Sequence, residues 1–206
     1  NYKKELINFS VSIDSPISKG ALVYQHPSLW WSALIKNLTF LKTKIELNKI
    51  ERISIDGTSG TILITNHLGN PLDNALMYND ASAVKESKLV ESISDNHPIV
   101  STSTNALVRA LSLINKLKKE KYRILHQADW IACKIINDYL YSDENNALKL
   151  GYDCVERSWP KWFDQLPIEM NSLPNIKIPG QPIGELRNSE LIDLGFSNKT
   201  MVIAGT

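Results

Sequence analysis

Alternating apolar and polar residues predict the strands of this chain. Residues 5–13 (ELINFSVSI) change character at almost every second position, which is typical of a half-buried strand. Two β-rich runs, 52–56 (RISID) and 61–65 (TILIT), flank the segment 57–60 (GTSG), and this arrangement predicts a hairpin with a tight loop. The apolar run 200–204 (TMVIA) predicts a buried strand in the last part of the sequence.

Hydrophobic residues three and four positions apart predict several helices. The predicted helices occupy residues 27–44, 80–93, 105–119 and 130–140. Asp129 precedes the last helix, where an acidic side chain suits the helix dipole. The order is therefore strand, helix, hairpin, helices, short pieces and a final strand. We expect a mixed α/β domain, and neither a helical bundle nor a β-sandwich.

Composition narrows the class of protein. The 206 residues, of which 43% are hydrophobic, are enough for one domain with a substantial core. Because 23 Lys and Arg residues nearly balance 22 Asp and Glu residues, we expect neither nucleic acid nor a membrane surface as a partner. No run approaches the ~18–20 apolar residues of a membrane helix, and we expect a cytoplasmic protein.

Few residues have the pattern of a metal site or a disulfide. Cys133 and Cys154 lie far apart in the sequence, in surroundings that suit reduced thiols better than a disulfide framework or zinc. The histidines are scattered, without a cysteine or carboxylate partner at ligand spacing. The sequence also lacks the glycine patterns of phosphate loops and dinucleotide-binding folds. We therefore assign no metal-binding residue.

Two short segments have the chemistry to bind a polyol. Residues 56–61 (DGTSGT) gather hydroxyls and backbone amides at a strand end, although spacing alone favours an ordinary hairpin turn. Tyr78, Asn79 and Asp80 combine an aromatic face, an amide and a carboxylate, which together suit a sugar. A helix cap formed by Asn79 or Asp80 explains the second segment at least as well.

Two other polar clusters are interpreted as structural. His126 and Asp129 are residue types used in acid–base catalysis, but three positions apart at a helix start they are more typical of a cap and a core polar contact. Residues 142–146 (SDENN) are interpreted as a solvated turn before the next element.

Six segments, in order, resemble the N-terminal domain of the FGGY family of carbohydrate kinases, most closely its xylulokinase-like and ribulokinase-like branch. Together they span nearly the whole chain. The segments are 55–61 (IDGTSGT), Pro71 with 76–80 (LMYND), 125–130 (LHQADW), 142–153 (SDENNALKLGYD), 179–180 (PG) with 183–184 (IG), and 202–206 (VIAGT).

The resemblance implies an α/β domain of the ribonuclease-H-like (actin-like ATPase) type. Complete kinases pair it with a second domain of the same architecture, and sugar and ATP meet in the cleft between the two. Ser59 is implied as a sugar contact, and the segment that matches 142–150 is implied to be mainly structural. The implied substrate-binding residues are Thr58, Ser59, Gly60, Tyr78, Asn79 and Asp80.

Two parts of the family pattern fall outside the matching segments. Complete members begin with a strand and an Asp-x-Gly-Thr turn that binds ATP phosphates and magnesium, and an aspartate that acts as general base follows the segment matching 202–206. We therefore expect residues 1–206 to form an incomplete N-terminal domain, to which we assign no catalytic residue. ATP and Mg²⁺ serve the complete family member, and we expect them to bind poorly to these residues alone, without useful phosphoryl transfer.

Three hypotheses for function follow. The first is a kinase fragment whose complete parent phosphorylates a small-molecule sugar such as ribulose or xylulose with ATP. The second is a non-catalytic sugar-binding or scaffold remnant that keeps Ser59 and Tyr78. The third is one chain of a split kinase, whose partner chain carries the missing domain. Self-association through an exposed sheet edge is also expected, because open strand edges pair readily.

Overall fold

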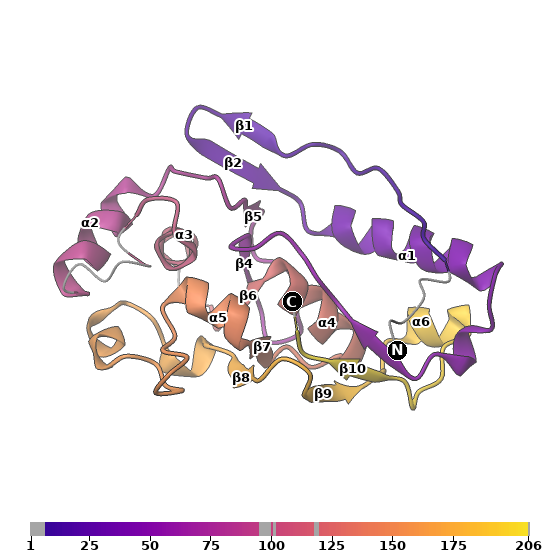
Figure 1. The fold of residues 1–206 in the computed structure, drawn as a ribbon. Helices are drawn as coiled ribbons and strands as arrows, with labels where there is room; N and C mark the ends of the chain where they lie inside the picture. The colour runs from indigo at the N-terminus through magenta and orange to yellow at the C-terminus, as the bar shows by residue number, and fades with distance from the viewer. Residues whose placement is uncertain (1–6, 95–99, 101, 118–119, 206) are drawn as a thin grey trace.

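The computed structural model describes residues 7–94, 100, 102–117 and 120–205. A five-stranded sheet, antiparallel throughout, has the strand order β1-β2-β5-β4-β6. In Figure 1 it runs from the β1–β2 hairpin at the top down to β6. The strands are β1 (Ile17–Lys19), β2 (Leu22–Gln25), β4 (Ile62–Thr65), β5 (Ala75–Leu76) and β6 (Arg123–His126).

Two smaller sheets join segments that are distant in the sequence. In one, β10 pairs in parallel with β3 and antiparallel with β9. In the other, β7 and β8 form a parallel pair. Parallel pairs need long connections, and here residues 55–200 connect β3 to β10 and residues 144–174 connect β7 to β8. The strands are β3 (Arg52–Ser54), β7 (Tyr141–Asp143), β8 (Asn175–Lys177), β9 (Pro182–Glu185) and β10 (Met201–Ile203).

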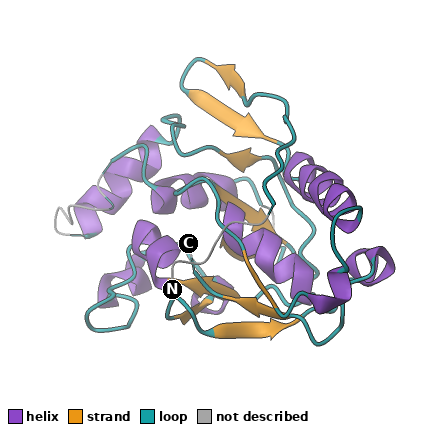
Figure 2. Ribbon diagram, turned by 45° about the vertical axis from the view of Figure 1, so that its right-hand side comes forward, coloured by secondary structure: helices purple, strands orange, loops and turns teal. Residues whose placement is uncertain are grey.

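The helices surround the sheets (Figures 1 and 2). α2 and α3 contact each other at one end of the molecule, and α1 and α6 contact each other at the opposite end. Among the described residues, no helix has the length and apolar character to cross a membrane. The α-helices are α1 (Ser28–Lys42), α2 (Val84–Ile93), α3 (Ala106–Ile114), α4 (Gln127–Ile136), α5 (Glu144–Leu150) and α6 (Ser189–Leu194), and the 3₁₀ helices are Leu47–Lys49, Lys161–Gln165 and Met170–Ser172.

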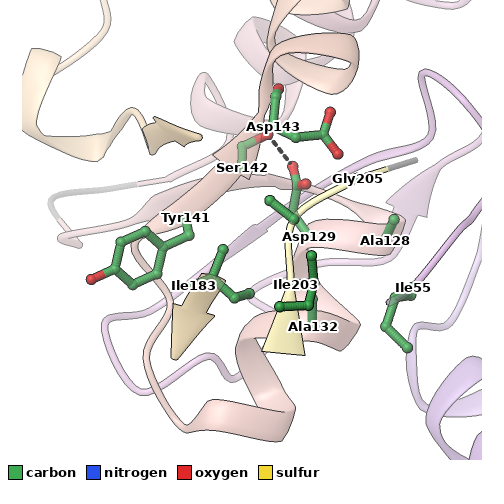
Figure 3. Close-up of a pocket in the computed structure, with 11 residues that line it drawn as sticks. Ile55, Ala128, Asp129, Ala132, Tyr141, Ser142, Asp143, Ile183, Ile203 and Gly205 are labelled. Carbon is green, nitrogen blue, oxygen red and sulfur yellow. Dashed lines mark hydrogen bonds between the residues drawn. The ribbon is translucent and has the colours of Figure 1, made fainter. Parts of the chain in front are cut away.

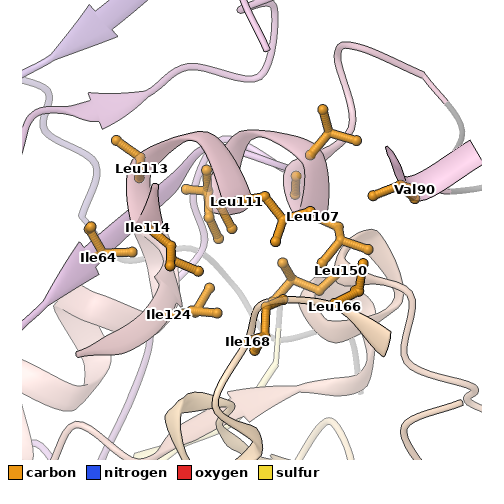
Figure 4. Close-up of a cluster of buried hydrophobic side chains, with 14 of the residues drawn as sticks. Ile64, Val90, Leu107, Leu111, Leu113, Ile114, Ile124, Leu150, Leu166 and Ile168 are labelled. Atoms are coloured by element: carbon orange, nitrogen blue, oxygen red, sulfur yellow. The ribbon is translucent and has the colours of Figure 1, made fainter. Parts of the chain in front are cut away.

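The side chains of β4 alternate between two hydrophobic clusters. Ile62 and Ile64 belong to a cluster with Leu107 and other residues of α3, part of which Figure 4 shows. Leu63 belongs to the second cluster, with Trp130 of α4. Full burial of an Ile or Leu side chain contributes about 1.5–3 kcal/mol, so this short strand ties both clusters to one sheet.

The predicted helices are confirmed, with shifted ends. α1 agrees with its prediction to within two residues. α3 begins after Asn105, whose side-chain oxygen accepts a hydrogen bond from the backbone N–H of Leu107 at 2.7 Å, and it ends at Ile114. α2 begins at Val84, later than predicted, because residue 80 is held in a preceding turn. The predicted strand 200–204 is confirmed as β10.

The predicted hairpin of residues 52–65 is wrong. β3 pairs with β10, whereas β4 pairs with β5 and β6, so the segment 57–60 connects two sheets. All four residues of β4 are buried. A strand buried on both faces needs covering layers on both sides and partners at both edges, which an isolated hairpin does not supply.

The predicted strand 5–13 is also wrong in its described part, residues 7–13, which has no regular secondary structure. Residues 5 and 6 lie outside the described residues. The ring of Phe9 stacks on that of Phe40 in α1, with the ring centroids 3.8 Å apart, but Ile7, Phe9 and Ile13 are all exposed. The alternation of this segment therefore does not correspond to a half-buried strand.

The conformation of the loop between β4 and β5 requires glycine at position 69. Gly69 has φ +77°, and its carbonyl accepts a hydrogen bond from Trp130 Nε1 at 2.9 Å. A Cβ at this position would overlap the ring of Tyr139. We expect Gly69→Ala to lower the free energy of unfolding by about 3 kcal/mol or more, measured by urea denaturation.

Gly20→Ala is the matched control for this substitution. Gly20 has a similar φ, +62°, but no atom lies within 4 Å of the added Cβ. Gly20→Ala should lower the free energy of unfolding by only about 1–2 kcal/mol, the cost of a left-handed backbone conformation for a residue with a Cβ. Equal losses for the two variants would show that the Tyr139 contact is unimportant.

Candidate functional site

The loop after β3 lies against the first turn of α4. The backbone N–H of Thr58 donates a hydrogen bond to Gln127 Oε1 at 2.7 Å. A Cβ on Gly57 would approach the backbone nitrogen of Ala128 to 3.2 Å, so glycine allows this close packing. The loop closes where the N–H of Thr61 donates to the carbonyl of Thr58 at 3.2 Å. Thr58 and Ser59 are left exposed to solvent.

The second predicted segment follows β5 and divides into exposed and buried parts. Tyr78 is 55% exposed, and Asn79 is also exposed. Asp80 is fully buried, and its carboxylate accepts hydrogen bonds from the backbone N–H of Val23 at 2.6 Å and from the hydroxyl of Ser82 at 2.9 Å. The Asp80 carboxylate therefore holds the segment to β2 and to the following turn.

The structure brings the two segments together. A Cβ on Gly60 would lie 3.9 Å from the Cβ of Tyr78, so the loop and the tyrosine are immediate neighbours. Arg109 of α3 lies behind them and donates hydrogen bonds to the carbonyl of Gly60 at 2.7 Å and to the carbonyl of Met77. Gly60 itself is buried, whereas Ser59, which precedes it in the chain, and Tyr78 are both exposed.

Arg109 was not among the predicted residues, although the sequence contained a signal for it. It is the only charged residue in α3, whose sequence is ALVRALSLI, and only 1% of it is exposed. Charged side chains are seldom buried without partners. An arginine inside such an apolar run therefore indicates a specific set of acceptors, but the sequence does not say where they are.

A second polar cluster forms around Asp129 (Figure 3). Its carboxylate accepts hydrogen bonds from the backbone N–H of His126 at 3.2 Å, from Ser142 Oγ at 2.7 Å and from Asn146 Nδ2 at 2.9 Å. The predicted role of His126 and Asp129 as a helix cap and core contact is confirmed. Because Asp129 caps α4 from inside the helix, α4 begins at Gln127, earlier than predicted.

Residues 142–146 do not form the predicted solvated turn. Ser142, Asp143 and Asn146 are buried, and Asp143 Oδ1 accepts a hydrogen bond from the backbone N–H of Asn146 at 2.9 Å, which caps α5. The polar side chains satisfy one another and Asp129, which removes the need for solvent. A pocket of about 20 Å³, enough for roughly one water molecule, lies beside Asp129 and Ser142, against the end of β10.

The two cysteines are free and poorly suited to nucleophilic chemistry. Burial raises the pKa of the Cys133 thiol far above its ordinary value, and burial also raises the pKa of Cys154. A thiol with a raised pKa holds little of the reactive thiolate at neutral pH. Within the described residues, no three His, Cys, Asp or Glu side chains are grouped so as to hold a metal ion.

Comparison with known proteins gives a family match over nearly the whole chain. The model of the FGGY family of carbohydrate kinases, N-terminal domain, matches residues 3–206. A xylulose kinase of Staphylococcus xylosus is 21% identical over 211 residues, covering 96% of this chain and 43% of that protein.

Solved structures of sugar and polyol kinases share the fold. The structure is similar to a xylulose kinase of Lactobacillus acidophilus, with a TM-score of 0.81 and 18% identity, covering 95% of this chain and 42% of that one. A gluconate kinase of the same organism gives a TM-score of 0.82 and 18% identity, with the same coverage of 95% and 42%. A glycerol kinase of Plasmodium falciparum gives a TM-score of 0.79 and 19% identity, covering 94% and 42%.

These relatives confirm the predicted fold class, a mixed α/β domain of the ribonuclease-H-like (actin-like ATPase) type. The chain spans less than half the length of each of them. Because the family model matches residues 3–206, this chain belongs to the FGGY family of carbohydrate kinases and corresponds to their N-terminal domain.

Proposed function

We propose that the area formed by the exposed residues Thr58, Ser59 and Tyr78 binds the sugar substrate of an FGGY kinase. The observation that supports this proposal is the adjacency of Gly60 and Tyr78, where Arg109 donates hydrogen bonds to the carbonyls of Gly60 and of Met77, the residue before Tyr78. It places two segments with sugar-binding chemistry on one surface. The family match makes a small-molecule sugar the substrate class.

Each exposed side chain in this area has a role in the proposal. Ser59 and Thr58 offer hydroxyls that both donate to and accept from sugar hydroxyls. The ring of Tyr78 covers the apolar C–H surface of the sugar, and the amide of Asn79 contacts a hydroxyl beside it. The carboxylate of Asp80 makes no such contact, because its oxygens already accept from Val23 and Ser82.

We further propose that the complete protein transfers the γ-phosphoryl group of ATP to a pentulose such as xylulose or ribulose. The support is the similarity to proteins described as xylulose kinases. A gluconate kinase and a glycerol kinase have the same fold. The described residues of this chain group no three potential metal ligands. We assign no residue of this chain to Mg²⁺ or ATP and derive no transfer step from its residues.

The sugar site can be tested by titrating xylulose and ribulose into the 206-residue chain in a calorimeter. We expect saturable binding that Ser59→Ala and Tyr78→Ala each weaken about 2- to 12-fold, the effect of losing one interaction of about 0.5–1.5 kcal/mol. Ser18→Ala, at an exposed serine of β1, is the control and should bind as the wild type does. No saturable heat with any sugar would contradict the proposed site.

A second experiment concerns phosphoryl transfer by these 206 residues alone. Transfer depends on positioning and on neutralising phosphate charge, and the implied phosphate-binding turn and general base fall outside the matching segments. We expect no turnover above background in a coupled ADP-release assay with ATP, Mg²⁺ and either pentulose. Turnover that Ser59→Ala abolishes would overturn this expectation.

The outer edge of β3, which pairs with no further strand among the residues that the structure describes, supports a second candidate, in which this chain associates with another polypeptide as part of a split kinase. β3 lies at the edge of its sheet, with β10 as its neighbour, and Arg52 and Ser54 are exposed. An open edge offers backbone donors and acceptors to a further strand. Light scattering after size exclusion separates the candidates, because a concentration-independent monomer that co-purifies with no second chain would contradict association.

A further inference from the structure

The guanidinium of Arg109 links three separate parts of the backbone. Nη2 donates to the carbonyl of Gly60 at 2.7 Å, Nη1 donates to the carbonyl of Met77, and Nε donates to the carbonyl of Asn105 at 3.3 Å. These acceptors lie in the loop before β4, in the segment after β5 and at the start of α3. One side chain therefore connects both segments of the proposed sugar site to the helix beneath them.

This guanidinium is buried and charged. Desolvation by burial lowers the pKa of Arg109 to about 10, and the nearby charge of Asp80 acts in the opposite direction. The side chain is thus protonated at neutral pH, and it needs its acceptors because an unpaired buried charge is strongly unfavourable. Arg109 and the two segments therefore constrain one another.

Gly60 provides both the conformation and the space that this link requires. Its φ is +78°, which favours glycine, and its carbonyl is the acceptor for Nη2. An added Cβ would lie 3.4 Å from Nη2 and 3.9 Å from the Cβ of Tyr78. The loop, the arginine and the tyrosine segment meet without a gap at this residue.

We propose that Arg109 is a positioning residue that fixes Ser59 relative to Tyr78 and thereby sets the affinity of the site for sugar. The part concerning affinity rests on the proposed function above. A planar guanidinium can donate to two carbonyls in a fixed fork, whereas a lysine ammonium cannot reproduce that geometry. Arg109 itself touches no sugar, since only 1% of it is exposed.

The test is Arg109→Lys in the 206-residue chain, with Arg123→Lys as the matched control. Arg123 also donates to a backbone carbonyl, that of Asn171, but it lies at the other end of the β4–β6 pair. We expect Arg109→Lys to weaken sugar binding about tenfold, because Ser59 and Tyr78 would no longer be held in one arrangement and binding would have to order them. Arg123→Lys should leave the affinity unchanged.

Amide hydrogen exchange supplies a readout that does not need sugar. For Arg109→Lys, exchange should accelerate at 57–61 and 77–80 together, and remain unchanged at 123–126. Acceleration within α3 alone, or in only one of the two segments, would overturn the linkage. If the wild-type chain binds no sugar, the proposed site fails, while the exchange data still decide whether Arg109 couples the segments.

Gly60→Ala is a second variant in case Arg109→Lys does not fold. It perturbs the same junction from the loop side, and we expect faster exchange at 77–80, across the link, together with weaker sugar binding. Unchanged exchange at 77–80 in a folded Gly60→Ala protein would overturn the proposal.

In a double-mutant cycle, Ser59→Ala and Arg109→Lys should be less than additive in binding free energy, since both act through the position of one hydroxyl. Additive effects would count against the link.

Discussion

The carboxylate of Asp129 is the interaction on which the arrangement of the central elements depends. It accepts hydrogen bonds from β6, β7 and α5, and these bonds compensate for removing a carboxylate from water. By fixing the start of α4, it also fixes Gln127, whose side chain holds the N–H of Thr58. The orientation of the exposed loop therefore follows from a buried polar contact on the other side of the helix.

Two other buried charged residues, Arg109 and Asp80, have the corresponding role at the other end of the loop. Asp80 ties the tyrosine segment to β2, and Arg109 ties the same segment to Gly60. Replacing such groups by apolar ones is often neutral or stabilising in proteins, so stability alone does not explain them. Their effect is geometric, because each holds the backbone beside an exposed residue, Tyr78 or Ser59, in a fixed position.

Local pattern predicted the parts of this fold that depend on local contacts. The periodicity of α1 and α3 and the cap formed by Asp129 involve residues close in sequence, and they are found as expected. Strand pairing is non-local. The local pattern therefore predicts a hairpin of β3 and β4, although the partners of these strands lie far along the chain. The polar run at 142–146 was assigned to solvent because its partner, Asp129, belongs to another element.

The same distinction separates the residues of the proposed site. Family resemblance selected six positions by their place in motifs, and motifs do not distinguish a residue that faces a ligand from one that holds the chain in place. Burial does: Tyr78 and Ser59 are exposed, whereas the carboxylate of Asp80 is buried and already hydrogen-bonded. Arg109 also holds the chain in place, although no motif contains it. Its acceptors lie in three segments that meet only in the folded protein, so the sequence does not identify them.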